Sequence, residues 1–87
     1  MPGGKSPDHL ALGRTLRQLR EERGLSQEEL GYRAGLSRNY VGNCERGEVN
    51  PSFSVLLSLA AALGTSFPDL ARAFAKERAG FRGGGRR

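Results

Sequence analysis

The chain has 87 residues, a formal net charge of +5 and a single cysteine, which fit one small domain. One cysteine excludes an internal disulfide, and no group of Cys and His residues has the spacing of a zinc site. The longest apolar stretch, residues 55–63, is too short to cross a bilayer, and the N-terminus lacks the apolar run of a signal peptide. We therefore expect a cytoplasmic protein that binds no metal or other cofactor.

The positive charge is concentrated at one end of the chain. Residues 72–87 contain six basic residues and one acidic residue, whereas residues 1–71 contain eight of each. The high pI therefore describes the C-terminus and not the rest of the chain. The last residues, GFRGGGRR, are typical of either a flexible, solvated terminus or a nonspecific phosphate-binding arm.

Hydrophobic spacing predicts five helices and no strand. Residues 1–6 are rich in Pro and Gly and are expected to be disordered. The first helix is predicted to begin at Pro7 or His9 and to end at Arg23, because leucines recur on one face and Gly24 follows.

Two short helices are predicted next, at residues 27–34 and 38–45. Ser26 and Glu29 form a capping box for the first of them, and Ser37 can cap the second. Gly35 can adopt a positive φ in the tight turn between the two helices. This arrangement is typical of a helix-turn-helix, which lays its second helix in the major groove of DNA.

The side chains of this unit are predicted to divide into an inner and an outer set. Their helical spacing predicts that four side chains point toward the same buried wedge between the two helices, namely Leu30, Leu36, Val41 and Cys44. We interpret Cys44 as a core residue, with a redox switch as the alternative. The outward set consists of Arg38, Asn39 and Asn43.

Two further helices complete the predicted domain. The fourth runs from Phe53 to about Gly64 behind a Ser52 cap, and it is apolar nearly all round, so we expect it at the buried centre. The fifth begins at Phe67, behind a capping signature formed by Ser66 and Asp69, and continues to about Lys76 or beyond. The folded domain is therefore expected over residues 7–78, followed by a Gly/Arg-rich flexible tail at 79–87.

Several segments between about Leu12 and Leu70 resemble the phage-repressor/Cro-like, or Xre, helix-turn-helix family. They are LRQLREERGLSQEEL, AGLS, the ERG at 45–47, the NPS at 50–52, LLSLAAALG at 56–64 and SFPDL. The resemblance implies an all-α, compact five-helix bundle with a lambda-repressor-like DNA-binding domain. It further implies a homodimeric transcriptional regulator, associated with the nucleoid, that binds a palindromic operator in double-stranded DNA.

The resemblance also implies roles for individual residues. Arg38, Asn39 and Asn43 match base-reading positions, and their chemistry agrees, since Arg can bridge guanine O6 and N7 and Asn can bridge adenine N6 and N7. Gln27, Tyr40 and Arg46 match positions that contact the DNA backbone. Arg20 and Glu45 match a partly buried structural ion pair.

Two residues depart from the family pattern. Gly42 lies inside the predicted recognition helix, where many relatives have Ser or Ala, and glycine there costs roughly 1 kcal/mol of helix stability relative to Ala. Glu48 follows that helix at a position that is often basic, and an acid there weakens attraction to phosphate.

Control by a small-molecule ligand is not expected in so short a chain. A dimer would supply a second recognition helix, and we expect its apolar contacts from Phe67, Phe74 and Phe81.

An enzyme is not expected, because the sequence contains no nucleophile–base pair, metal set or phosphate loop. The alternative is a protein-interaction module, such as an antitoxin or a coactivator-like adaptor, that uses the same fold.

Overall fold

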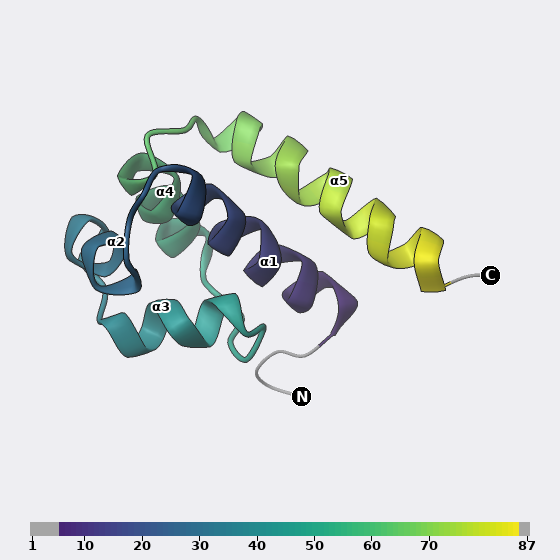
Figure 1. Ribbon diagram of the computed structural model, residues 1–87, viewed down its shortest axis with the longest axis horizontal. Coiled ribbons are helices and arrows are strands. Elements are labelled where there is room, and N and C mark those ends of the chain that lie inside the picture. The colour runs from purple at the N-terminus through teal and green to yellow at the C-terminus, as the bar shows by residue number, and fades with distance from the viewer. Residues whose placement is uncertain (1–5, 86–87) are drawn as a thin grey trace.

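The computed structural model describes the backbone of residues 6–85 and the side chains of residues 6–80. Within this part of the chain the structure is all-α, as predicted, and contains no strand (Figure 1). The helices are α1 (Pro7–Glu22), α2 (Gln27–Ala34), α3 (Arg38–Glu45), α4 (Phe53–Ala62) and α5 (Phe67–Gly85). The predicted bounds of α2 and α3 are confirmed.

Local capping chemistry sets where the helices begin. Each N-terminus follows a serine whose hydroxyl accepts a hydrogen bond from the backbone N–H three residues later. The pairs are Ser6–His9, Ser26–Glu29, Ser37–Tyr40, Ser52–Val55 and Ser66–Asp69. Because these signals depend only on neighbours in the sequence, four of the five could be predicted; the cap at Ser6 was not.

The C-terminal helix is longer than predicted. α5 continues to Gly85, whereas the sequence suggested a flexible tail from residue 79. A glycine ends a helix by adopting a positive φ, and the positive-φ glycines of the described residues lie at 24, 35, 47 and 64, all before α5. α5 also runs antiparallel beside α1 (Figure 1). Two ion pairs join these helices: Arg78 with Asp8, and Arg14 with Glu77, whose Nε and Oε2 atoms lie 3.5 Å apart.

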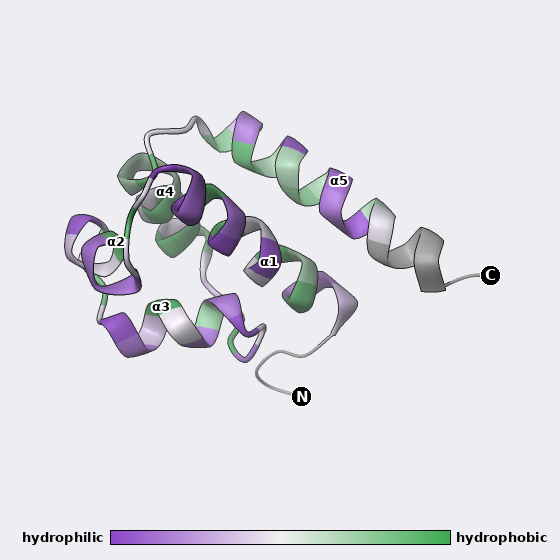
Figure 2. Ribbon diagram, viewed as in Figure 1, coloured by the Kyte–Doolittle hydropathy of each residue, from purple (hydrophilic) through white to green (hydrophobic). Residues whose placement is uncertain are grey.

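The prediction that α4 lies at the buried centre was wrong in part. Leu59 and Ala60 are buried, but Phe53 is 62% exposed and Leu57 is 42% exposed. One face of α4 contacts α2 and α5, and the other face has no described neighbour that covers it. In Figure 2, hydrophobic positions are densest on α4, whereas the beginning of α3 is hydrophilic.

The core joins all five helices. Its buried members are Leu16, Leu30, Val41, Cys44, Leu59, Ala60, Leu63 and Leu70. Three of the four predicted wedge residues belong to it, and the fourth, Leu36, packs against it half-buried. Cys44 is therefore a core residue, and burial raises the pKa of its thiol to about 11.

No single helix of the described residues is long and apolar enough to cross a membrane; α4 and the first part of α5 reach that length only together, across a 102° bend.

Gly13 sets the distance between α1 and α3. A Cβ atom at this position would lie 2.5 Å from the backbone oxygens of both Cys44 and Glu45. No local pattern in the sequence indicates this contact, because Gly13 and the end of α3 are more than 30 residues apart in the chain. The last turn of α3 therefore rests directly on the backbone of α1.

We predict that Gly13→Ala lowers the free energy of unfolding by about 1–3 kcal/mol, because backbone atoms cannot move aside as a flexible side chain can. Gly80→Ala is the matched control: a Cβ there meets no atom within 4 Å, so the helix gains up to about 1 kcal/mol. Urea denaturation of both variants measures the difference. Equal stability of the two variants would contradict the close approach of α1 and α3.

Candidate nucleic-acid interface

α2 and α3 form a helix-turn-helix. Gly35 adopts a φ of 74° at the end of α2, and the N–H of Leu36 donates to the carbonyl of Gly31 at 2.8 Å. A Cβ at position 31 would lie 2.5 Å from the carbonyl oxygen of Leu36, so the turn requires a glycine there as well. Two glycines thus allow α3 to leave α2 at a steep angle.

The outer face of α3 carries the predicted base-reading residues. Arg38 and Asn39 are exposed in the first turn, and Asn43 follows one turn later, half-buried. Residues four apart lie on the same side of a helix, so Asn39 and Asn43 share a face. The structure therefore presents one cation and two amides together along the helix.

Tyr40 is oriented differently from its outward neighbours. It is half-buried and packs against the core, and burial raises the pKa of its hydroxyl. The core thus holds much of the ring. Contact with the DNA backbone therefore depends on the part of the side chain that remains accessible.

Glu45 joins the first three helices. Its carboxylate accepts from Arg20 Nε of α1 at 2.6 Å and from Arg20 Nη2 at 3.0 Å, a bidentate ion pair. The Glu45 side chain is 3% exposed and that of Arg20 is 11% exposed. Glu45 raises the pKa of Arg20 above its ordinary value, chiefly through the hydrogen bond. A third Arg20 nitrogen, Nη1, donates to the carbonyl of Leu25 at 2.8 Å, so the loop before α2 is held by the same side chain.

Gln27 extends this arrangement to α2. Its Nε2 donates to Glu45 Oε1 at 3.0 Å, so the amide of the first α2 residue is bound to the last residue of α3. The structure thus places Gln27 against the end of α3, where it supports that helix. Its predicted contact with DNA phosphate would use the half-exposed remainder of the side chain.

Gly42 has no side chain, so the side chains of Arg46 and Gln27 can lie close to the backbone of α3. A Cβ there would lie 3.1 Å from Arg46 Nη1 and 3.5 Å from Gln27 Oε1. Arg46 uses this space to reach Asn43, whose side-chain oxygen accepts from Arg46 Nη2. Arg46 Nε also lies 3.3 Å from Glu48 Oε2. The two residues that departed from the family pattern, Gly42 and Glu48, therefore both border the Arg46 guanidinium.

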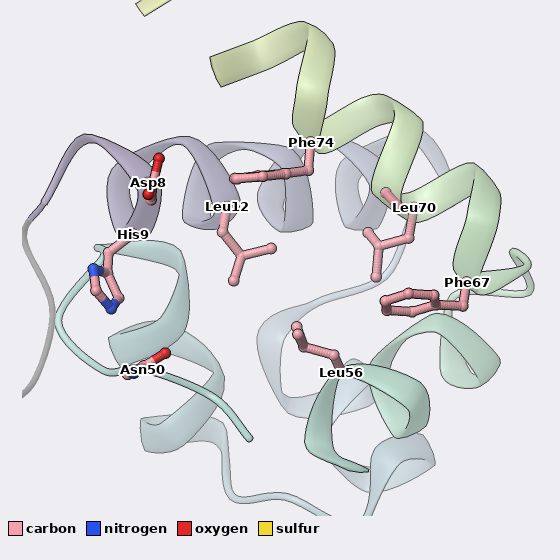
Figure 3. Close-up of a pocket in the computed structure, with 9 residues that line it drawn as sticks. Asp8, His9, Leu12, Asn50, Leu56, Phe67, Leu70 and Phe74 are labelled. Atoms are coloured by element: carbon pink, nitrogen blue, oxygen red, sulfur yellow. The ribbon is translucent and has the colours of Figure 1, made fainter. Parts of the chain in front are cut away.

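The aromatic residues predicted for a dimer surface have different environments. Phe67 and Phe74 line a pocket of about 380 Å³ between α1, α4 and α5, where they face the side chains of Leu12, Leu56 and Leu70 (Figure 3). They are half-buried because α5 lies against α1. The side chain of Phe81 lies outside the described residues.

Two apolar residues of α4 remain exposed, although the sequence predicts that this helix is buried. They are Phe53 and Leu57, and both face solvent. The ring of Phe53 meets that of Phe67 edge to face, with centroids 5.3 Å apart. Phe53 and Leu57 are four residues apart, so the sequence does indicate that they share one face of the helix. Because this helix is apolar all round, the sequence does not show which of its faces is covered.

Comparisons with known proteins agree with this geometry. Residues 11–74 match the helix-turn-helix domain family, over α1 to α4 and the first turns of α5. The chain belongs to the helix-turn-helix family, of the Xre type.

Three relatives illustrate the range of this family. The HTH-type transcriptional regulator y4dJ of Sinorhizobium fredii is 44% identical over 68% of this chain and 77% of its own length. The control protein C.SmaI of Serratia marcescens is 46% identical over 68% of this chain and 70% of its own. The crystal structure of the restriction-modification controller protein C.AhdI of Aeromonas hydrophila has a TM-score of 0.73 and 45% identity, covering 75% of this chain and 98% of that chain.

We predict that Glu45→Ala lowers the free energy of unfolding of this helix-turn-helix protein by about 3–5 kcal/mol, because it leaves the buried Arg20 charge without its carboxylate. Arg17→Ala is the control, since it breaks an exposed ion pair with Glu21 and should cost less than about 1 kcal/mol. Thermal and urea unfolding compare the variants. A Glu45→Ala protein as stable as Arg17→Ala would show that the Glu45 network is dispensable.

Proposed function

We propose that this helix-turn-helix regulator binds a palindromic operator in double-stranded DNA as a homodimer, with α3 in the major groove. The observation that carries the proposal is the outer face of α3, where Arg38, Asn39 and Asn43 are accessible on a helix held from behind by Glu45. A rigid helix with an exposed cation and amides can distinguish base edges. Such a protein would act in the cytoplasm, at the nucleoid.

The exposed cation is the strongest single candidate for base recognition. Arg38 begins α3, and the N-terminal residues of a recognition helix are those that enter the groove. Its guanidinium can donate two parallel hydrogen bonds to guanine O6 and N7, which no other base offers. We propose Asn39 and Asn43 as the neighbouring readers.

Contacts to phosphate would position the helix in the groove without specifying sequence. We propose Gln27, Tyr40 and Arg46 for this role. Gln27 and Arg46 both approach Gly42, so their polar groups lie together on one side of α3. Since residues 1–71 have no net charge, this local cluster is more relevant than the overall pI.

Selection of binding sites from randomised duplex DNA, followed by sequencing, tests the proposal. We predict that the wild-type protein enriches a palindrome and that Arg38→Ala loses the preference at one base pair of each half-site, about 5- to 150-fold. Arg17→Ala, which removes an exposed arginine of α1, should enrich the same palindrome as wild type. Absence of any enriched sequence would overturn the proposal and favour the protein-interaction module, which tight capture of a co-encoded protein would identify.

A dimer would place two recognition helices about 34 Å apart, one turn of DNA. We propose that the dimer contact is centred on the exposed Phe53 and Leu57 of α4, with Phe67 at its edge. Of the set expected from the sequence, Phe67 adjoins this surface, and Phe74 lines the pocket beside α1. A pair of exposed apolar side chains on one helix face is typical of an interaction surface.

Sedimentation or light scattering at tens of micromolar tests the dimer. We predict that Phe53→Lys yields a monomer with weaker operator binding, because a charge cannot be buried in an apolar contact. Since Phe53 is largely exposed in the single chain, the variant should still fold. Tyr32→Lys is the control, because Tyr32 is exposed on α2 and should leave the dimer intact. A wild-type monomer, or a dimer in Phe53→Lys, would contradict this surface.

A further inference from the structure

The guanidinium of Arg46 is held by three neighbours. Arg46 Nη2 donates to the side-chain oxygen of Asn43, and Arg46 Nε lies 3.3 Å from Glu48 Oε2. The third neighbour is the bare backbone of Gly42, where a Cβ would lie only 3.1 Å from Arg46 Nη1. An arginine that contacted only phosphate would need neither a partner on the base-reading face nor this space.

The contact determines which way the Asn43 amide faces. An amide side chain has an oxygen that accepts and a nitrogen that donates, and the two can exchange places by rotation about the last bond. A guanidinium donates only, so the oxygen must face Arg46. The NH₂ group of Asn43 is therefore the end turned away from Arg46.

We propose that Arg46 determines the base read by Asn43, fixing the amide so that Asn43 donates to guanine instead of bridging adenine. The inference rests on the proposed function, since it concerns the same face of α3. Asn43 would contact the base directly, and Arg46 would be a positioning residue that acts through it.

The chemistry of the two purines separates these alternatives. Guanine presents two acceptors in the major groove, O6 and N7, which match the NH₂ group of the amide. Adenine presents an acceptor at N7 and a donor at N6, so bridging it requires the amide oxygen as well. With that oxygen bound to Arg46, the site favours guanine.

The simpler role for Arg46, a contact to phosphate alone, makes a different prediction. A phosphate contact carries no sequence information, so its loss weakens binding evenly at every sequence and lowers the salt dependence. A positioning role instead changes the preference at the one base pair that Asn43 reads. Base preference therefore distinguishes the two roles, whereas affinity alone does not.

Arg46→Lys is the informative variant, because it keeps the positive charge for phosphate but removes Nη2, the atom that donates to the Asn43 oxygen. Site selection and competition binding are compared for wild type, Arg46→Lys, Asn43→Ala and the double variant. The base pair read by Asn43 is the one whose preference disappears in Asn43→Ala. Arg46 is exposed and Asn43 is half-buried outside the hydrophobic core, so the fold should be retained in each variant.

We expect wild type to prefer guanine over adenine at that base pair by about tenfold, and Arg46→Lys to reduce the preference to about twofold or less. The slope of affinity against salt should be unchanged, because the charge is kept. In the Asn43→Ala background, Arg46→Lys should have no further effect on the preference.

An adenine preference in wild type, or an unchanged preference in Arg46→Lys, would overturn this inference while leaving operator binding intact. The same holds if the two substitutions act independently of each other. If wild type enriches no sequence at all, the proposed function fails and this inference fails with it. The two failures are therefore distinguishable in one experiment.

Discussion

The orientation of α3, the proposed recognition helix, depends on one carboxylate. Glu45, the last residue of α3, binds Arg20 of α1 through two hydrogen bonds and Gln27 of α2 through a third. Close contact between α1 and α3 brings the carboxylate within reach of Arg20, and Gly13 permits that contact. A buried ion pair is strong only when its remaining donors and acceptors are also satisfied; here the Leu25 carbonyl accepts from Arg20, and Gln27 donates to Glu45. α2 and α3, two short helices that would each be marginal alone, are thereby held against α1 in one arrangement.

This rigid support separates the two sides of α3. Val41 and Cys44 face the core, so the opposite side can carry polar residues without weakening the fold. Gly42 lies between the core-facing residues and the polar residues of α3, and a glycine there costs helix stability. Because it has no side chain, the polar ends of Gln27 and Arg46 can lie over the backbone of α3. A residue that looked like a weakness in the sequence thus has a structural use. The polar face and its support are built from the same eight-residue helix.

Much of the fold was predictable because its signals are local. Serine caps and the turn glycine depend on hydrogen bonds and backbone angles within a few residues, and they placed α2 and α3 correctly. The Arg20–Glu45 pair came from the family resemblance, since 25 positions separate the two residues and no local rule joins them. The exposed side of α4 and the continuation of α5 were missed, because they depend on which distant helix covers which face. Phe74 shows this most clearly: its spacing marked an apolar residue, and only the packing of α5 against α1 shows that it lines a pocket between the helices.

By itself, the sequence determined the helices, the helix-turn-helix and the outward position of Arg38 and Asn39, since short-range capping and periodicity carry that information. The tertiary structure decided the rest. It brought Glu45 to Arg20 and Gln27, placed α1 directly against α3 at Gly13, and left Phe53 and Leu57 uncovered. It also brought the Arg46 guanidinium over Gly42 to Asn43. These contacts depend on distances and side-chain directions in space, and hydrophobic periodicity along a chain contains neither.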